Sequence, residues 1–61
     1  MNDTQIINDA YADAVRKLFA IFSDVTIIAK NAGERTLAEQ RFQAGVQKAR
    51  EIRDRAITLL S

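Results

Sequence analysis

Apolar residues recur at alternating steps of four and three along two long stretches of this chain. In the first stretch these positions hold Ile7, Tyr11, Ala14, Leu18, Ile21, Val25 and Ile28. In the second stretch they hold Ala38, Phe42, Gly45, Ala49, Ile52, Ala56 and Leu59. A repeat that averages about 3.5 residues is typical of the seam along which two α-helices pack. The pattern predicts an all-α fold with helices at about residues 3–31 and 37–60, the first capped by Asn2 or Asp3.

The residues between the two stretches combine a signal that ends a helix with a signal that begins one. Gly33 suits the left-handed position that follows a helix. Thr36 and Glu39 have the spacing of a capping box, in which each side chain bonds the backbone N–H of the other. We therefore expect a turn at residues 32–36 and a single domain over residues 1–61, folded as an antiparallel two-helix hairpin.

Folding the chain at Gly33 brings together residues whose numbers sum to 66 or 67. In five of the seven layers formed in this way, a large side chain faces Ala or Gly. A core needs such alternation to fill space without voids. Gly45 costs roughly 0.5–1 kcal/mol relative to Ala inside a helix, and Ile21 facing it would supply a packing reason.

The hairpin leaves apolar side chains beyond those of the seam. A two-helix hairpin covers only one side of each helix, so a helix that is apolar further round needs another partner. We expect two hairpins to dimerise into a four-helix bundle and to bury this flank between them. The predicted dimer interface is Val15, Phe19, Phe22, Ala29 and Val46. The alternatives are a different protein on the same flank, a tetramer or higher assembly, and one continuous helix about 85 Å long.

Composition excludes several kinds of chemistry. The chain has no Cys and no His, which removes disulfides, thiolate nucleophiles, imidazole bases and zinc sites built on those residues. Asp9 and Asp13 share a helix face, but no third metal ligand accompanies them, so a solvated face is the favoured interpretation. We therefore expect no catalytic, cofactor-binding or metal-binding residues and no enzymatic activity.

Positive charge is concentrated in the second half of the chain, although the net charge is only +1. Arg41, Lys48 and Arg55 recur every seven residues and form a basic stripe, which together with Arg53 is the candidate nucleic-acid contact. The pI of about 8.2 is below the value above 9 that is usual for nucleic-acid domains. Ion pairs at i,i+4 are the simpler account of most charges: Asp13–Lys17, Arg35–Glu39, Glu51–Arg55 and Arg50–Asp54.

Small residues facing large ones, in a hairpin of 61 residues with a central turn, resemble the Rop proteins. Those are plasmid-encoded RNA-binding proteins that dimerise into four-helix bundles. The resemblance covers length, turn position and layer pattern, and it carries over no functional residue. It implies the bundle architecture and adds RNA as one class of partner, by analogy of fold.

These observations favour a non-enzymatic protein-interaction module or regulator that acts as a homodimer and binds a further, unidentified protein. The alternative is an RNA- or DNA-binding regulator of Rop-like architecture that uses the basic stripe. We expect no membrane partner, because the most apolar stretch, residues 18–29, is shorter than the roughly 20 residues of a membrane span. Asp3 and Asp9 precede any Lys or Arg, unlike a secretory signal, so we expect a cytoplasmic protein.

Overall fold

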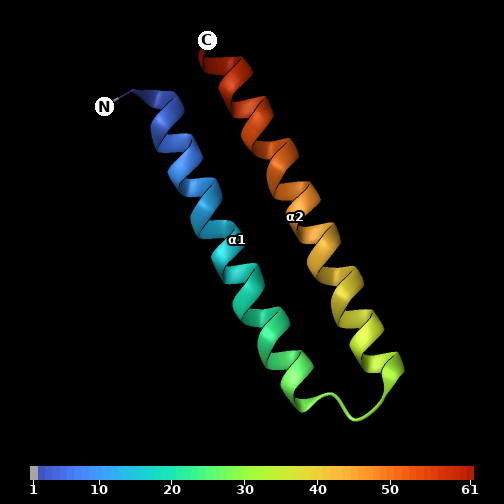
Figure 1. The fold of residues 1–61 in the computed structure, drawn as a ribbon. Helices are drawn as coiled ribbons and strands as arrows, with labels where there is room; N and C mark the ends of the chain where they lie inside the picture. The colour runs from blue at the N-terminus through green and yellow to red at the C-terminus, as the bar shows by residue number, and fades with distance from the viewer. Residues whose placement is uncertain (1) are drawn as a thin grey trace.

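The computed structural model describes residues 2–61, and within them the chain forms two α-helices and no strand. Helix α1 runs over Asp3–Ile28 and helix α2 over Ala32–Leu60. Figure 1 shows the helices side by side and antiparallel, with both termini at one end and the turn at the other. The predicted all-α fold and the two-helix hairpin are confirmed.

Helix α1 begins where the sequence predicts. The Asn2 side chain accepts a hydrogen bond from the backbone N–H of Gln5, over 2.8 Å, so Asn2 is the N-cap. Asp3 follows in the first turn, where its negative charge opposes the positive end of the helix dipole. The helix ends at Ile28, about three residues earlier than expected, because Ala29 adopts an extended conformation.

The predicted turn at residues 32–36 is wrong. The turn occupies residues 29–31, and α2 begins at Ala32. Gly33 lies inside the first turn of α2, and no glycine in the part of the chain that the structure describes has a positive φ. Gly33 therefore does not end a helix, and the left-handed conformation expected of it is absent.

A second capping signal, upstream of the predicted one, starts α2. The Asn31 side chain accepts a hydrogen bond from the backbone N–H of Glu34, over 2.9 Å. The Glu34 carboxylate reaches back and accepts from the backbone N–H of Lys30, over 2.7 Å. These two bonds resemble the reciprocal bonds of a capping box, and Asn is a stronger N-cap than Thr. Thr36 and Glu39 consequently lie within the helix.

The earlier start of α2 changes the register between the helices. Residues that face each other sum to 63, as Leu18 and Gly45 do, or to 64, as Phe22 and Phe42 do, rather than to 66 or 67. The two phenylalanine rings are stacked, with centroids 5.0 Å apart and planes 28° apart. The predicted pairing of Ile21 with Gly45 is wrong, and Ile21 is 62% exposed.

The contact between the helices buries very little. Among residues 2–61 only Ala38 is buried, with 4% of its surface exposed. Side chains along the contact, such as Leu18 and Phe22, are half-buried. Four residues predicted in the seam lie instead on an exposed flank: Ile21, Ile28, Ile52 and Leu59. One line of contact between two helices can cover only one side of each, and the shifted register places these four outside it.

The close approach of Leu18 explains the glycine in the middle of α2. A Cβ atom at position 45 would lie 2.6 Å from Leu18 Cδ2 and 3.3 Å from Leu18 Cδ1. These atoms are the flexible end of the Leu18 side chain, so alanine at position 45 would require that side chain to turn aside. Leu18 packs between the helices, so we expect this repacking to cost about 1–3 kcal/mol, against the roughly 0.5–1 kcal/mol of helix propensity that alanine would add. The expectation that Gly45 has a packing reason is confirmed, with Leu18 rather than Ile21 as the partner.

The effect of Gly45→Ala on the free energy of unfolding is expected to change sign when the residue at position 18 is changed. In the native background we expect it to lower the free energy of unfolding by about 1 kcal/mol, because Leu18 must move. In a Leu18→Ala background the same change is expected to raise that free energy by about 0.5–1 kcal/mol through helix propensity alone. Urea unfolding of the four variants measures both effects. An effect of the same sign in both backgrounds would contradict the assigned contact.

Candidate functional site

The described hairpin is a rod, so its candidate functional surfaces are outer faces rather than a cleft. The principal extents are 46 × 17 × 7 Å and the radius of gyration is 14.3 Å, against about 10.5 Å for a compact chain of this length. The accessible surface is 4790 Å², whereas a compact monomer of 6.8 kDa exposes about 3,950 Å². The hairpin therefore carries a surplus of roughly 800 Å².

Large apolar side chains make up much of this surface. Among residues 2–61, nine of them are exposed: Ile6, Phe19, Ile21, Ile27, Ile28, Leu37, Ile52, Leu59 and Leu60. They divide between two faces of the hairpin and the outer side of α1. Isolated exposed apolar residues are ordinary, but contiguous ones mark interaction surfaces.

The first face carries an apolar groove between the helices, which we call the basic groove. Its turn end is lined by Ile21, Ile28, Leu37 and Arg41, among others. Its terminal end is lined by six further residues, among others: Ala14, Lys48, Ala49, Ile52, Arg55 and Leu59. The basic stripe recurs every seven residues along α2, so both ends of the groove lie on one face.

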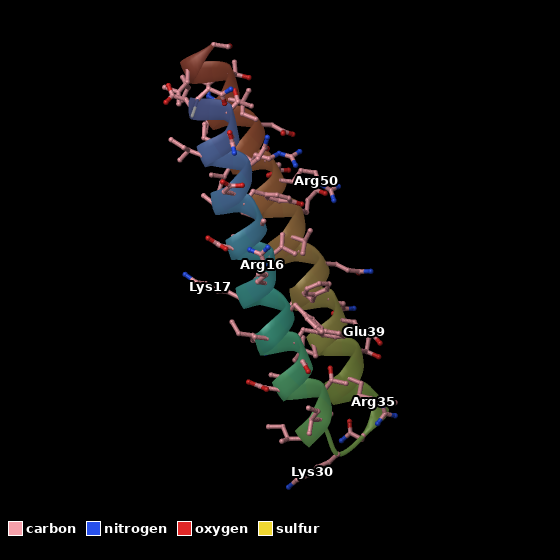
Figure 2. All side chains as sticks on the ribbon, turned by 60° about the vertical axis from the view of Figure 1, so that its left-hand side comes forward. Arg16, Lys17, Lys30, Arg35, Glu39 and Arg50 are labelled. Atoms are coloured by element: carbon pink, nitrogen blue, oxygen red, sulfur yellow. The ribbon has the colours of Figure 1, made fainter. Side chains whose placement is uncertain are left out.

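The three cations of the basic stripe are exposed and form no ion pair with another described residue. The ion pairs in residues 2–61 join Asp13 to Arg16, over 2.7 Å, and Arg53 to Asp54, over 2.8 Å. The i,i+4 pairs predicted from the sequence do not form, and Lys17, Glu39 and Arg50 extend away from the hairpin in Figure 2. Exposed pairs gain only about 0–1 kcal/mol, which barely offsets the entropy of ordering two long side chains.

Arg53 differs from the other candidate nucleic-acid contacts. Its guanidinium carbon lies 4.5 Å from the centroid of the Tyr11 ring, a cation–π geometry. Its Nε and Nη2 groups also bind the Asp54 carboxylate, over 2.9 and 2.8 Å. Arg53 is thus half-buried and held within the chain, while Arg41, Lys48 and Arg55 remain available to a ligand.

The second face, which we call the neutral flank, contains the predicted dimer interface. Phe19 is 51% exposed there. Val15, Phe22, Ala29 and Val46 are half-buried in the single hairpin. The Phe22 ring stacks on Phe42 of its own chain, so Phe22 belongs to the hairpin contact as well as to the neutral flank.

One column of positions along α1 on the neutral flank carries no charge, and Arg16 and Asp24 border it beside Phe19. Positions 8, 12, 15, 19, 23 and 26 recur at steps of three and four, and therefore follow one helix face. They hold uncharged side chains only: Asn8, Ala12, Val15, Phe19, Ser23 and Thr26. This neutral column contrasts with the groove, which the basic stripe borders.

The described residues offer no metal centre, since none of their acidic side chains gather in a group of three or more. Neither described helix has the length and apolar character to cross a membrane. No protein-family model, curated protein or solved structure matches this chain.

Sequence reasoning missed the groove because it placed Ile21, Ile28, Ile52 and Leu59 inside the seam. A usable signal was present in the chain. Asn31 and Glu34 have the same spacing as a capping box and predict an earlier start for the second helix. That start would have moved the register and exposed the four residues.

Proposed function

We propose that this hairpin is a protein-interaction module that works as a homodimer, with two hairpins forming a four-helix bundle. The observation that carries the proposal is the surplus surface. Roughly 800 Å² per chain is the area that each partner buries in a protein interface of standard size. A core with a single buried residue, Ala38, supports the same conclusion, because domains of about 60 residues are marginal without a partner.

The neutral flank is the better face for the second copy. A twofold dimer brings the same patch of both chains together, so any charge in the patch approaches itself. The neutral column of α1 contains no charge, and Phe19 projects from its middle. Pairing through the basic groove would instead bring Arg41, Lys48 and Arg55 of both copies towards one another, which is unfavourable.

Small side chains around Phe19 support close packing in such a dimer. Ala12 lies seven residues before it and Ser23 four residues after it on the same helix face. Large residues that face small ones interdigitate without voids. In the proposed bundle, the Phe19 ring of each copy packs among Ala12, Val15 and Ser23 of the other.

Sedimentation equilibrium tests the proposal. We expect the native chain at micromolar concentration to have twice the mass of 6.8 kDa. Phe19→Glu is expected to give the monomer mass, because it brings two carboxylates into an apolar contact. The matched control is Ile27→Glu, which adds the same charge to α1 at a residue that is 76% exposed, and it should remain a dimer.

Two results would overturn the proposal. One is a native chain that sediments as a monomer while melting cooperatively at a temperature independent of concentration. The other is a dimer that withstands Phe19→Glu, which would move the interface to another face.

A further inference from the structure

We propose that the basic groove is the docking site for an acidic amphipathic helix of a partner protein. This inference rests on the proposed function and names the class of partner that the module takes. It concerns the face opposite the one assigned to dimerisation, so each copy in the dimer would keep its groove open.

The groove has the apolar floor that a helix needs. Ile21 and Ile28 lie seven residues apart on α1, and Ile52 and Leu59 lie seven residues apart on α2. All four are more than half exposed in the hairpin. Seven residues rise about 10.5 Å along a helix, which is the spacing of successive apolar positions in a partner with a heptad pattern.

At its terminal end, beside Ile52, the floor is hollow. There the groove widens into a depression of about 290 Å³, lined by Ala14, Ala49 and Ile52, with Tyr11 and Arg53 also on its wall. Alanines leave room for one large side chain of a partner. A large apolar or aromatic residue that fills such a hollow is the usual anchor of a helix bound in a groove.

Charge complementarity selects an acidic partner. Arg41, Lys48 and Arg55 follow one edge of the floor at intervals of about 10.5 Å and span about 21 Å, or four turns of a helix. They form no ion pair within residues 2–61. A docked helix with Glu or Asp at every seventh position would place one carboxylate beside each cation. The partner is therefore apolar along one stripe and acidic along the adjacent one.

The same features make a nucleic acid the weaker occupant. Arg53, which lines the hollow at the terminal end, is held against Tyr11 and Asp54, so one of the four candidate phosphate contacts is already engaged within the chain. Glu34 and Glu51 also line its ends. A phosphodiester backbone carries a charge at every nucleotide and would meet both carboxylates, whereas a helix can carry its acidic residues beside the cations and uncharged residues beside Glu34 and Glu51. Exposed isoleucine and leucine side chains between the charges match an apolar stripe and have no counterpart in a phosphodiester chain.

Fluorescence anisotropy with designed peptides tests the inference. The probe is a labelled peptide of three heptads, with Leu at the a and d positions, Glu at the e positions, and Ala or Gln elsewhere. A second peptide has Lys in place of Glu. At about 50 mM salt, where screening is weak, we expect the acidic peptide to bind at least about tenfold more tightly than the basic one.

Charge reversal in the groove should reverse this preference. The Arg41→Glu/Lys48→Glu variant is expected to bind the acidic peptide about tenfold more weakly than the native chain does, and to prefer the basic peptide. The matched control is Arg35→Glu/Arg50→Glu, with the same change of net charge at exposed positions outside the groove; it should stay within about twofold of native binding. Ile52→Asp should weaken the binding of both peptides, because it places a charge on the apolar floor.

Several outcomes separate the possibilities. Equal binding of the two peptides, or no reversal in the Arg41→Glu/Lys48→Glu variant, would overturn the inference. So would salt-dependent binding of an RNA duplex without binding of the acidic peptide, which would assign the groove to nucleic acid. Sedimentation of the Arg41→Glu/Lys48→Glu variant keeps the two proposals distinct. If the variant is a dimer and shows no change in peptide preference, only this inference is rejected. If the variant is a monomer, the assignment of dimerisation to the neutral flank is rejected.

Discussion

Replacing Phe22 with glutamate is expected to unfold the hairpin at room temperature. The Phe22 ring stacks on Phe42, with 5.0 Å between centroids, and is half-buried between the helices. Burying a large apolar side chain contributes about 1.5–3 kcal/mol, and an aromatic pair adds about 0.5–1.5 kcal/mol. Small domains of this length rarely have more than about 3–5 kcal/mol of stability in total. Losing this one contact would therefore remove most of it.

Far-ultraviolet circular dichroism during urea titration measures the effect. We expect the native chain to show a cooperative transition and Phe22→Glu to show little helix and no transition. Ile27→Glu is the matched control, since it adds the same charge to an exposed part of α1 and should change the unfolding free energy by less than about 0.5 kcal/mol. Similar curves for Phe22→Glu and the control would contradict the assigned stacking.

Replacing Ala38 with glutamate is the second change with a large expected effect. Ala38 is the most buried of the described residues and lines the groove next to Val25 of α1. A longer side chain there overpacks the contact, at a cost of about 1–3 kcal/mol. An unpaired carboxylate held between the helices adds several kcal/mol more unless the helices separate. We expect the variant to lose its cooperative unfolding transition.

Two further variants separate the effect of side-chain size from the effect of charge at position 38. Ala38→Leu adds size without charge and should lower the unfolding free energy by about 1–3 kcal/mol while the hairpin still folds. Ala44→Glu adds the same charge at an exposed position of α2 and should change that free energy by less than about 0.5 kcal/mol. Equal stability of Ala38→Glu and Ala44→Glu would show that the helices do not meet at Ala38.

The two helices could be predicted because their signals are local. Asn2 caps α1 through a bond to Gln5, three residues away. The apolar repeat that marks each helix needs only neighbours three and four positions apart. Both features depend on residues within about one helical turn, so no knowledge of the partner helix was needed.

The turn could not be predicted with the same success, because the chain contains two competing start signals. Two pairs have the three-residue spacing of a capping box: Asn31 with Glu34, and Thr36 with Glu39. The second pair lies five residues after the first. The structure uses Asn31 and Glu34. The start at Ala32 also lets Phe22 stack on Phe42, a contact between residues far apart in the sequence that no local pattern reports.

The residues of the candidate surfaces are determined by the register between the two helices rather than by composition. The apolar surplus was evident in the sequence, and Phe19 is exposed as expected. Phe22, predicted on the same flank, is shared with the hairpin contact. Ile21 and Ile52, predicted inside, form the floor of the basic groove. Counting apolar residues reveals that there are too many for one hairpin, but not which of them remain outside.

The sequence by itself determined that this protein is a pair of amphipathic helices, more apolar than one hairpin can cover and without side chains for thiol or imidazole chemistry. Only the tertiary structure decided which apolar residues are left over. A shift of three residues in the sum of facing positions moved Leu18 onto Gly45 and turned Ile21 outward. The physical reason is that a helix exposes a different face at every residue, so a small change in the turn exchanges the covered side chains for exposed ones.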